Sequence, residues 1–397
     1  KTINDNINNL SHTAFPYSNE IVVEYAKKIC EITPGNYPKR MAFALAGMEA
    51  VDGAFKLARW YTRRPQQIAY IGAHAGFTGF ALSITAHYPA QHKGFHPLIP
   101  GTVYAPYPYS YRCPLGLSDN INNKEKSNGN CDTCSEKTCC EESSYKCLDY
   151  LENYLMKTVA PPENVSAIFF EPFLGPGGMV PSPREYVKGL REICDKHNIL
   201  LVADEILSGF GKTGKMFAME HWGVTPDLMT FAKGVTSGYQ PVGGVIATPK
   251  VYEAFVGGND KTFFHGYTYS GHPAAAAAGL ANLEIIEREN LVQNAADTGA
   301  YLRNQLEALR EHSMVSHING TGLMLAIQLV DDKATGEPLD PNTQKAKRLA
   351  EEIENRGMLT RTAPFLYLSP PLTLTREEAD EIVTIIDDAL TAVEQDG

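Results

Sequence analysis

Short apolar runs alternate with longer segments of helical periodicity from about residue 37 to residue 283. Each run is followed by Gly, Pro or a helical pattern; the runs are MAFAL, QIAYI, SAIFFEP, ILLVADE, LMTFAK and VGGVIAT. This alternation predicts an α/β fold with a mainly parallel sheet that is covered by helices on both faces. Ligands of such sheets bind at the carboxyl ends of the strands, so the residues that end these runs are the first candidates for a functional site.

A different pattern follows. A long polar helix is predicted from about Leu283 to His312, then a strand over LMLAIQLV, and then a final helix that begins at a capping box formed by Thr375 and Glu378. A chain of 397 residues also exceeds what one hydrophobic core usually supports. We therefore expect an N-terminal segment over residues 1–20, a large domain over 21–283 and a small C-terminal domain over 284–397.

The segment from Asp119 to Glu142 interrupts the alternation, because it is rich in Asn, Lys, Glu, Ser and Cys and nearly lacks aliphatic residues. It predicts a surface insertion at about 113–147. Four of its cysteines form a C-x-x-C motif followed by a pair, namely Cys131, Cys134, Cys139 and Cys140. This spacing is compatible with zinc or an iron–sulfur cluster, but free thiols or local disulfides are the more common interpretation of such cysteines.

The chain has 35 basic and 46 acidic residues, a formal net charge of −11, and no Lys/Arg-rich stripe. A nucleic-acid partner is therefore not expected. No apolar run is long enough to span a membrane, which favours a cytoplasmic protein that binds small molecules. The sequence begins at Lys1 rather than Met, so we expect the natural start to lie upstream, and a targeting peptide stays open.

Two of the apolar runs end in residues of complementary chemistry. The run ILLVADE contains the acid Asp204 near its end, and the run LMTFAK ends in the amine Lys233, 29 positions later. A cofactor built on a pyridine ring needs a carboxylate that keeps the ring nitrogen protonated and an amine that forms a Schiff base. Either residue alone would most simply be a solvated strand end. Together they predict a cofactor site.

A third run supplies an anion site. The strand-forming MAFAL leads into Ala46-Gly47-Met48 and then into a helix whose apolar face carries Ala54, Leu57, Ala58 and Tyr61. Backbone N–H groups at a helix start bind phosphate. The junction between strand, glycine and helix is a common motif, and it gains weight here from Asp204 and Lys233.

Residues 204–244, DEILSGFGKTGKMFAMEHWGVTPDLMTFAKGVTSGYQPVGG, resemble the signature of class III (subgroup II) aminotransferases, which depend on pyridoxal 5'-phosphate (PLP) and have fold type I. The resemblance continues through HGYTYSGHPAAAAAGLANLEII and a C-terminal R-T-x(5)-L-S-P-P-L stretch. It implies a mostly parallel seven-stranded sheet between helices and a smaller α+β C-terminal domain. An N-terminal segment that helps to line the site in the family is expected to be absent.

The resemblance also implies roles for individual residues. Asp204 would pair with the pyridinium nitrogen, Ile206 would press on one face of the ring, and Lys233 would hold the cofactor as a Schiff base and move the proton. Thr268 would reach the phosphate of the neighbouring subunit's cofactor, so the active sites would be shared across a homodimer. The partners implied are a small amino donor and a 2-oxo acid acceptor.

Several positions depart from the family pattern around the cofactor. Family members carry hydroxyl residues where this chain has Ala46 and Met48 beside Gly47, which lowers the expected affinity for phosphate. The aromatic residue that stacks on the ring corresponds to His74, whose imidazole covers less area. A Gln that commonly follows the DEV or DEI triplet is Leu207.

Other departures concern the substrate. The Glu that controls carboxylate binding in members acting on 2-amino acids or 4-aminobutyrate is Pro176, and an Arg found in many α-amino-acid members is Tyr367. Arg361 instead occupies the position of the mobile arginine of ω-amino acid and amine transaminases. A solvated loop arginine is the alternative interpretation of Arg361.

These features predict an ω-transaminase that moves an amino group from a β- or ω-amino acid, an amine or an acyl derivative to pyruvate or 2-oxoglutarate by a ping-pong mechanism. An amino-acid racemase or epimerase is the alternative, because residues 106–112 resemble a PYPxxYR stretch of some relatives. A non-catalytic protein with the same fold is a third hypothesis, motivated by Ala46 and Met48. The presence of both Asp204 and Lys233 argues against it.

Overall fold

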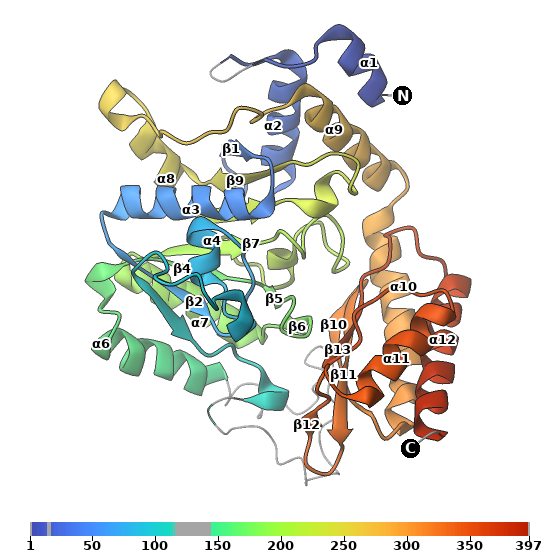
Figure 1. Cartoon of the computed structure of the whole chain (residues 1–397). Helices are drawn as coiled ribbons and strands as arrows, with labels where there is room; N and C mark the ends of the chain where they lie inside the picture. Colours follow the sequence, from blue (N-terminus) through green and yellow to red (C-terminus); the bar gives the residue numbers. More distant parts are fainter. Residues whose placement is uncertain (1, 14–16, 114, 116–143, 396–397) are drawn as a thin grey trace.

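The computed structural model describes residues 2–13, 17–113, 115 and 144–395, and its centre is a seven-stranded sheet (Figure 1). The strand order is β1-β9-β8-β7-β4-β2-β3. Strand β9 runs antiparallel to both of its neighbours, and the remaining adjacent pairs are parallel. The predicted mostly parallel sheet is confirmed. The strands are β1 Arg40–Ala44, β2 Gln66–Tyr70, β3 Thr102–Ala105, β4 Val165–Phe170, β7 Leu200–Asp204, β8 Leu228–Phe231 and β9 Gly243–Ala247.

Helices cover both faces of this sheet. Successive residues of a strand point to opposite faces, and in β4 Phe169 packs with Phe55 of helix α3, whereas Phe170 packs beside Tyr186 of α7. Full burial of a side chain such as Phe55 stabilises the fold by roughly 1.5–3 kcal/mol. The helices of this part are α1 Thr2–Asn9, α2 Glu20–Ile32, α3 Gly47–Thr62, α4 Gly79–Ile84, α6 Met156–Thr158, α7 Arg184–His197, α8 Pro249–Tyr252 and α9 Pro273–Arg288.

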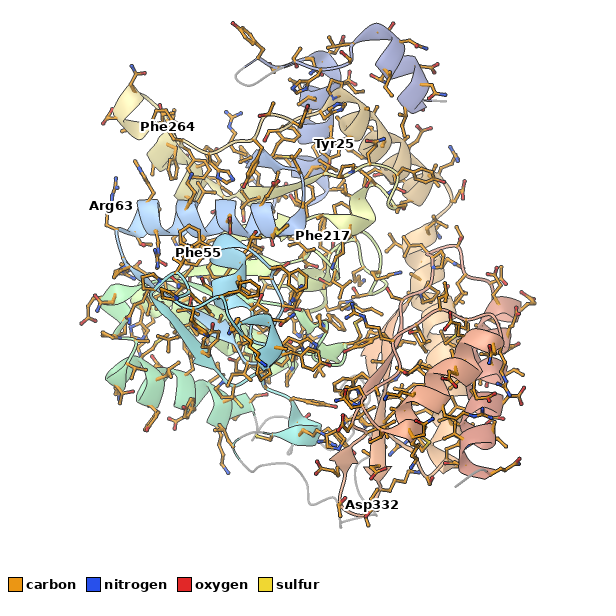
Figure 2. All side chains as sticks on the ribbon, viewed as in Figure 1. Tyr25, Phe55, Arg63, Phe217, Phe264 and Asp332 are labelled. Carbon is orange, nitrogen blue, oxygen red and sulfur yellow. The ribbon has the colours of Figure 1, made fainter. Side chains whose placement is uncertain are left out.

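Helices α2 and α9 lie side by side at one end of the molecule (Figure 1). Tyr25 of α2 is fully buried against Gly279 of α9, where an added Cβ would lie 2.4 Å from the Tyr25 ring (Figure 2). The close approach explains why position 279 is a glycine. This pairing ties the first long helix to the helix that leads toward the C-terminal sheet.

The C-terminal part forms a second, antiparallel sheet with its own core. Its strands are β10 Val315–Thr321, β11 Met324–Asp332, β12 Glu337–Pro338 and β13 Phe365–Leu368, and its helices are α10 Leu291–Leu306, α11 Gln344–Asn355 and α12 Arg376–Gln395 (Figure 1). The capping box is confirmed: Thr375 N–H donates to Glu378 Oε2 at 2.9 Å, and Glu378 N–H donates to Thr375 Oγ1 at 3.2 Å.

The single polar helix predicted from Leu283 to His312 is wrong. Helix α9 ends at Arg288 and α10 begins at Leu291, because Asn290 adopts the left-handed conformation at φ 51°. Asn tolerates that conformation better than most residues, so it ends one helix and starts the next. The domain limits at residues 20/21 and 283/284 stay predictions.

The four cysteines of the predicted metal motif, Cys131, Cys134, Cys139 and Cys140, lie outside the described residues, as does most of the predicted insertion. Of the described cysteines, Cys30, Cys147 and Cys194 are free thiols. Among the residues placed by the structure, no group of three or more His, Cys, Asp or Glu is arranged to hold a metal ion. No helix in that part of the chain is long and apolar enough to cross a membrane.

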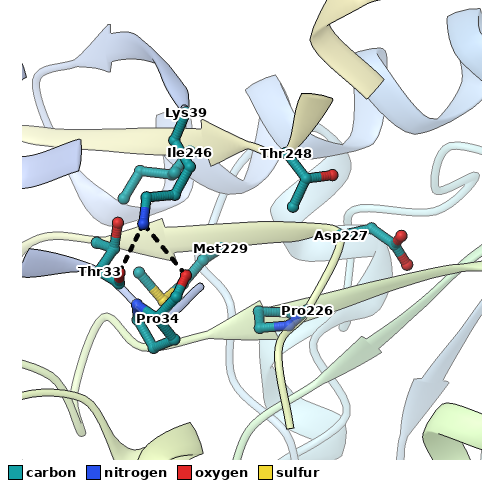
Figure 3. Close-up of a pocket in the computed structure, with 8 residues that line it drawn as sticks. All are labelled: Thr33, Pro34, Lys39, Pro226, Asp227, Met229, Ile246 and Thr248. Carbon is teal, nitrogen blue, oxygen red and sulfur yellow. Dashed lines mark hydrogen bonds between the residues drawn. The ribbon is translucent and has the colours of Figure 1, made fainter. Parts of the chain in front are cut away.

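A polar network fastens the amino ends of the central strands. Asp227, which precedes β8, accepts from Arg191 at 2.8 Å and from Lys250 at 2.9 Å, and also from the N–H of Leu201 at 2.9 Å. Nearby, Lys39 Nζ donates to the carbonyls of Thr33 and Pro34 at the end of α2 (Figure 3). These charges have partners, so we assign this edge of the sheet a structural role.

Candidate active site

Asp204 and Lys233 lie at the carboxyl ends of adjacent parallel strands. Asp204 ends β7 and is in register with Thr230 of β8, and Lys233 follows three residues later. Lys233 has a positive φ of 44°, which turns the chain sharply at the strand end. Burial raises the pKa of Asp204 to about 6, while the N–H of Ile206 at 3.0 Å and the nearby Lys233 ammonium oppose that rise. The predicted acid and amine are thus brought together.

Ile206 and Gly47 are in direct contact beside this pair. A Cβ on Gly47 would lie 2.9 Å from Ile206 Cδ1, so the start of α3 approaches the end of β7 as closely as a glycine permits. Ala46, at the N-cap of α3, provides no side-chain hydrogen bond to the first N–H groups of the helix. These donors have no partner within the helix and suit an anion.

Met48 packs against the loop that follows β2. A Cβ on Gly76 would lie 2.5 Å from Met48 Cβ, and the Thr78 hydroxyl donates to Met48 Sδ at 3.2 Å. Thr78 is exposed and its partner is a weak acceptor, so this hydroxyl is free to bond to a stronger one. Thr78 was not predicted from the sequence, because the hydroxyl comes from another loop rather than from the Ala46-Gly47-Met48 motif.

His74 lies in the same loop after β2. Its backbone N–H donates to Glu171 Oε1 at 2.8 Å, and its ring Nδ1 is 3.2 Å from Gln91 Nε2. Burial lowers the pKa of His74, and the positive charges of Lys233 and Arg361 lower it further. The imidazole is therefore held neutral near Lys233, as a ring that stacks on an aromatic ligand should be.

The side chain of Arg361 is exposed, yet its positive charge also acts on His74 and on the groups beside it. Burial lowers the pKa of His87 to about 4, and His74 and Arg361 contribute to that shift. Burial also raises the pKa of Tyr367, and the neighbouring Arg361 opposes this. Two segments far apart in the sequence, one with His74 and His87 and one with Arg361 and Tyr367, therefore converge on one region. His87 was not predicted from the sequence.

Tyr367 and Pro176, the two positions that differ from the substrate-binding residues of the family, contact each other. The Tyr367 hydroxyl, on β13, donates to the carbonyl oxygen of Pro176, in the loop that joins the short strands β5 Phe173–Leu174 and β6 Val180–Pro181 after β4. Phe365 lies against Gly178 of the same loop. A neutral hydrogen bond therefore connects the two positions at which the resembled family carries a Glu and an Arg in many of its members.

Thr268 is exposed on the segment between α8 and α9. Its carbonyl oxygen accepts from His12 Nε2 at 2.9 Å, which holds the segment against the N-terminal residues. Phe264, in the same segment, is 81% exposed and projects at the edge of the molecule (Figure 2). Thr268 is thus available to a neighbouring molecule.

Glu171 was overlooked although the sequence contains the signal for it. It directly follows β4, just as Asp204 ends β7. The run SAIFFEP predicts an acid at the end of a strand in the same way as the run ILLVADE. Burial raises the pKa of Glu171 to about 8, and Asp204 adds to the rise. The loss of water around the carboxyl group is the main cause.

These residues fit a flat ring that carries a phosphate and an aldehyde. The ring would lie between Ile206 and His74, its nitrogen facing Asp204 and its aldehyde facing Lys233. The phosphate would meet the N–H groups at the start of α3. The close contact between Gly47 and Ile206 supports this fit, because any larger residue at 47 would disturb both the helix start and the ring face.

Comparison with known proteins gives a consistent result. The family of class-III aminotransferases matches residues 1–390. A diaminobutyrate–2-oxoglutarate transaminase of Halomonas elongata is 35% identical over 96% of this chain and 79% of its own length. An alanine/serine racemase of Pyrococcus horikoshii is 34% identical over 98% and 77%. An amine transaminase from an uncultivated Pseudomonas species, solved in the PLP-bound form, superimposes with a TM-score of 0.88, 32% identity and coverage of 99% and 86%.

Proposed function

The chain belongs to the class III aminotransferases, PLP-dependent enzymes that take an amino group from a donor and pass it to a keto acid, and on this premise we propose its substrates, its residue roles and its assembly. The proposed donor is a β- or ω-amino acid, an amine or an acyl derivative, and the acceptor is pyruvate or 2-oxoglutarate. One observation carries the proposal: a neutral contact joins Tyr367 and Pro176, the two positions at which members that act on α-amino acids carry an Arg and a Glu.

Lys233, Asp204 and the start of α3 have distinct roles in this proposal. When bound, PLP supplies an aldehyde that takes up the amino group and a ring that withdraws electrons from the substrate carbon. Lys233 Nζ holds the cofactor covalently and then carries the proton at the substrate carbon. Asp204 keeps the ring nitrogen protonated, and the N–H groups of Gly47 and Met48 hold the phosphate.

Arg361 binds the carboxylate group of the substrate. Its guanidinium lies near His74, His87 and Tyr367, and the side chain itself is exposed and so has freedom to move. A planar guanidinium binds a carboxylate through two charge-assisted hydrogen bonds. When a neutral amine binds, Arg361 turns toward solvent, and the site accepts both kinds of substrate.

The assembly is a homodimer in which Thr268 reaches the phosphate of the partner's cofactor. The exposed side chains around Thr268 support this, because Phe264 is 81% exposed and Tyr269 is 55% exposed. Large exposed apolar side chains that gather in one segment are typical of an interface. Sedimentation of the wild-type protein should give twice the mass of the chain, and Thr268→Ala should weaken PLP binding without changing that mass.

Racemization is the alternative reaction, and the racemase of Pyrococcus horikoshii is the observation in its favour. The segment 106–112 that resembles racemases supports it less, since Tyr111 stacks on His317 at 4.4 Å and Arg112 donates to the carbonyl of Gly336, both in the C-terminal part.

A panel of donors and acceptors separates the two reactions. The purified enzyme with PLP is given one amine or ω-amino acid and pyruvate or 2-oxoglutarate, and the new amino acid is quantified. In parallel, each single L-amino acid is given without an acceptor, and its D-enantiomer is measured. Transamination without inversion supports the proposal, whereas inversion without net amino transfer would replace it with racemization.

A further inference from the structure

Glu171 is a buried acid that the roles above do not use. It is the first residue after β4, at the same edge of the sheet as Asp204, and only 9% of its surface is exposed. Both oxygens of its carboxyl group accept backbone hydrogen bonds, Oε1 from His74 N–H at 2.8 Å and Oε2 from Gly175 N–H at 2.9 Å. One side chain therefore connects the loop after β2 with the loop after β4.

Each of these loops presents a group to the candidate site. The first carries the His74 ring, and the second carries the Pro176 carbonyl that accepts from Tyr367. There is little room for adjustment at Gly175, because an added Cβ would lie 2.5 Å from Leu207 Cδ2 and 3.3 Å from Glu171 Oε2. The loop is thus held between Glu171 on one side and Leu207 on the other.

The backbone of Glu171 is also held in place. The Tyr107 hydroxyl, from the segment after β3, donates to the Glu171 carbonyl oxygen at 3.0 Å. The charged groups that face the carboxyl group are Asp204 and Lys233. A buried N–H group that loses its acceptor is destabilised, so removing this carboxyl group destabilises two loops at once.

We propose that Glu171 is a positioning residue, which fixes the His74 ring and the Pro176 carbonyl in the active site through the N–H groups of His74 and Gly175. This inference rests on the proposed function for the meaning of those two groups. The hydrogen bonds themselves can be tested without any substrate or cofactor.

The matched control is Glu205, another fully buried carboxyl group that accepts two backbone hydrogen bonds, from Ala218 at 3.0 Å and Met219 at 2.8 Å. It accepts from a different segment and contacts neither His74 nor Gly175 in these bonds. Both Glu171→Leu and Glu205→Leu remove a buried carboxyl group, and the control position is the more deeply buried of the two, 0% exposed against 9%. Glu171→Gln keeps one oxygen acceptor and covers the case in which Glu171→Leu does not fold.

Amide hydrogen exchange of the cofactor-free protein is the direct readout. In Glu171→Leu, the peptides that contain His74 and Gly175 should exchange at least about ten times faster, and in Glu171→Gln by a smaller factor, because exchange reports local opening. Glu205→Leu should leave both peptides unchanged. Equal exchange in wild type and Glu171→Leu, or equal acceleration in Glu205→Leu, would overturn the proposal.

With PLP added, the visible circular dichroism band of the bound cofactor reports the surroundings of the ring. It should fall by half or more in Glu171→Leu, and KM for both substrates should rise about tenfold, while Glu205→Leu keeps the band. A band and KM within twofold of wild type would also overturn the proposal. If wild type transfers no amino group at all, the proposed function fails, whereas the exchange result still decides the role of Glu171.

Discussion

Replacing Arg361 with Ala tests whether this side chain binds the carboxylate group of the substrate. The guanidinium is near enough to His74 and His87 to lower both of their pKa values, so a substrate in that region meets its charge. A hydrogen bond to a charged group contributes about 1.5–3 kcal/mol, which corresponds to a change of roughly 10- to 150-fold in an equilibrium constant. Because Arg361 is exposed, the lower half of that range is expected.

The assay measures KM for pyruvate and, separately, for a neutral amine donor, in wild type, Arg361→Ala and the control Arg376→Ala. Arg376 packs over the Tyr301 ring at 5.1 Å on helix α12, so its loss removes a positive charge without touching the site. In Arg361→Ala the KM for pyruvate should rise tenfold or more, while the KM for the amine changes less than threefold. Equal losses for both substrates, or a similar loss in Arg376→Ala, would refute the reasoning.

Asp204, Met48 and Glu205 each allow a further prediction. Asp204→Asn should retain bound PLP and lose about a hundredfold or more in kcat, because an amide cannot stabilise the positive ring nitrogen; a rate within a few-fold of wild type would assign that role elsewhere. Met48→Thr should tighten PLP binding by about 2- to 10-fold in an equilibrium titration, since it adds a hydroxyl donor at the phosphate; weaker binding would mean that the phosphate lies elsewhere. The pKa of Glu205 is raised to about 7 by burial, so the folded state keeps a proton that the unfolded chain releases above its ordinary value of 4.5. Stability should therefore fall as pH rises between about 4.5 and 7, and urea unfolding of Glu205→Gln should show a flatter profile over this window; identical profiles would contradict the assignment.

Much of the fold was readable because buried strands leave a strong signal. The runs that end at Asp204 and Lys233 are nearly continuous apolar segments, and their adjacency follows from the rule that parallel strands present their carboxyl ends at one edge. Strand β3 was missed because TVYA is short and lies at the edge of the sheet. The break at Asn290 was missed because a residue in the left-handed conformation does not interrupt the helical periodicity on either side.

The less predictable part of the site depends on contacts between distant segments. The Tyr367 hydroxyl and the Pro176 carbonyl are 191 residues apart, and a backbone carbonyl carries no sequence signal. The hydrogen bond from His74 to Glu171 likewise uses a backbone N–H, so it cannot be predicted from the identity of residue 74. Sequence patterns therefore identify the groups that end strands, whereas the groups that are held by backbone hydrogen bonds emerge only from the folded chain.

The lysine that binds PLP can be identified by trapping the cofactor on the protein. The wild-type enzyme is incubated with PLP, reduced with borohydride so that the Schiff base becomes stable, and digested for peptide mass mapping. Lys212 is the competing candidate, because burial lowers the pKa of its amine to about 8. We predict that the pyridoxyl group appears on the peptide that contains Lys233 and is absent after Lys233→Ala. Its attachment to Lys212, or active enzyme with Lys233 unmodified, would contradict the account.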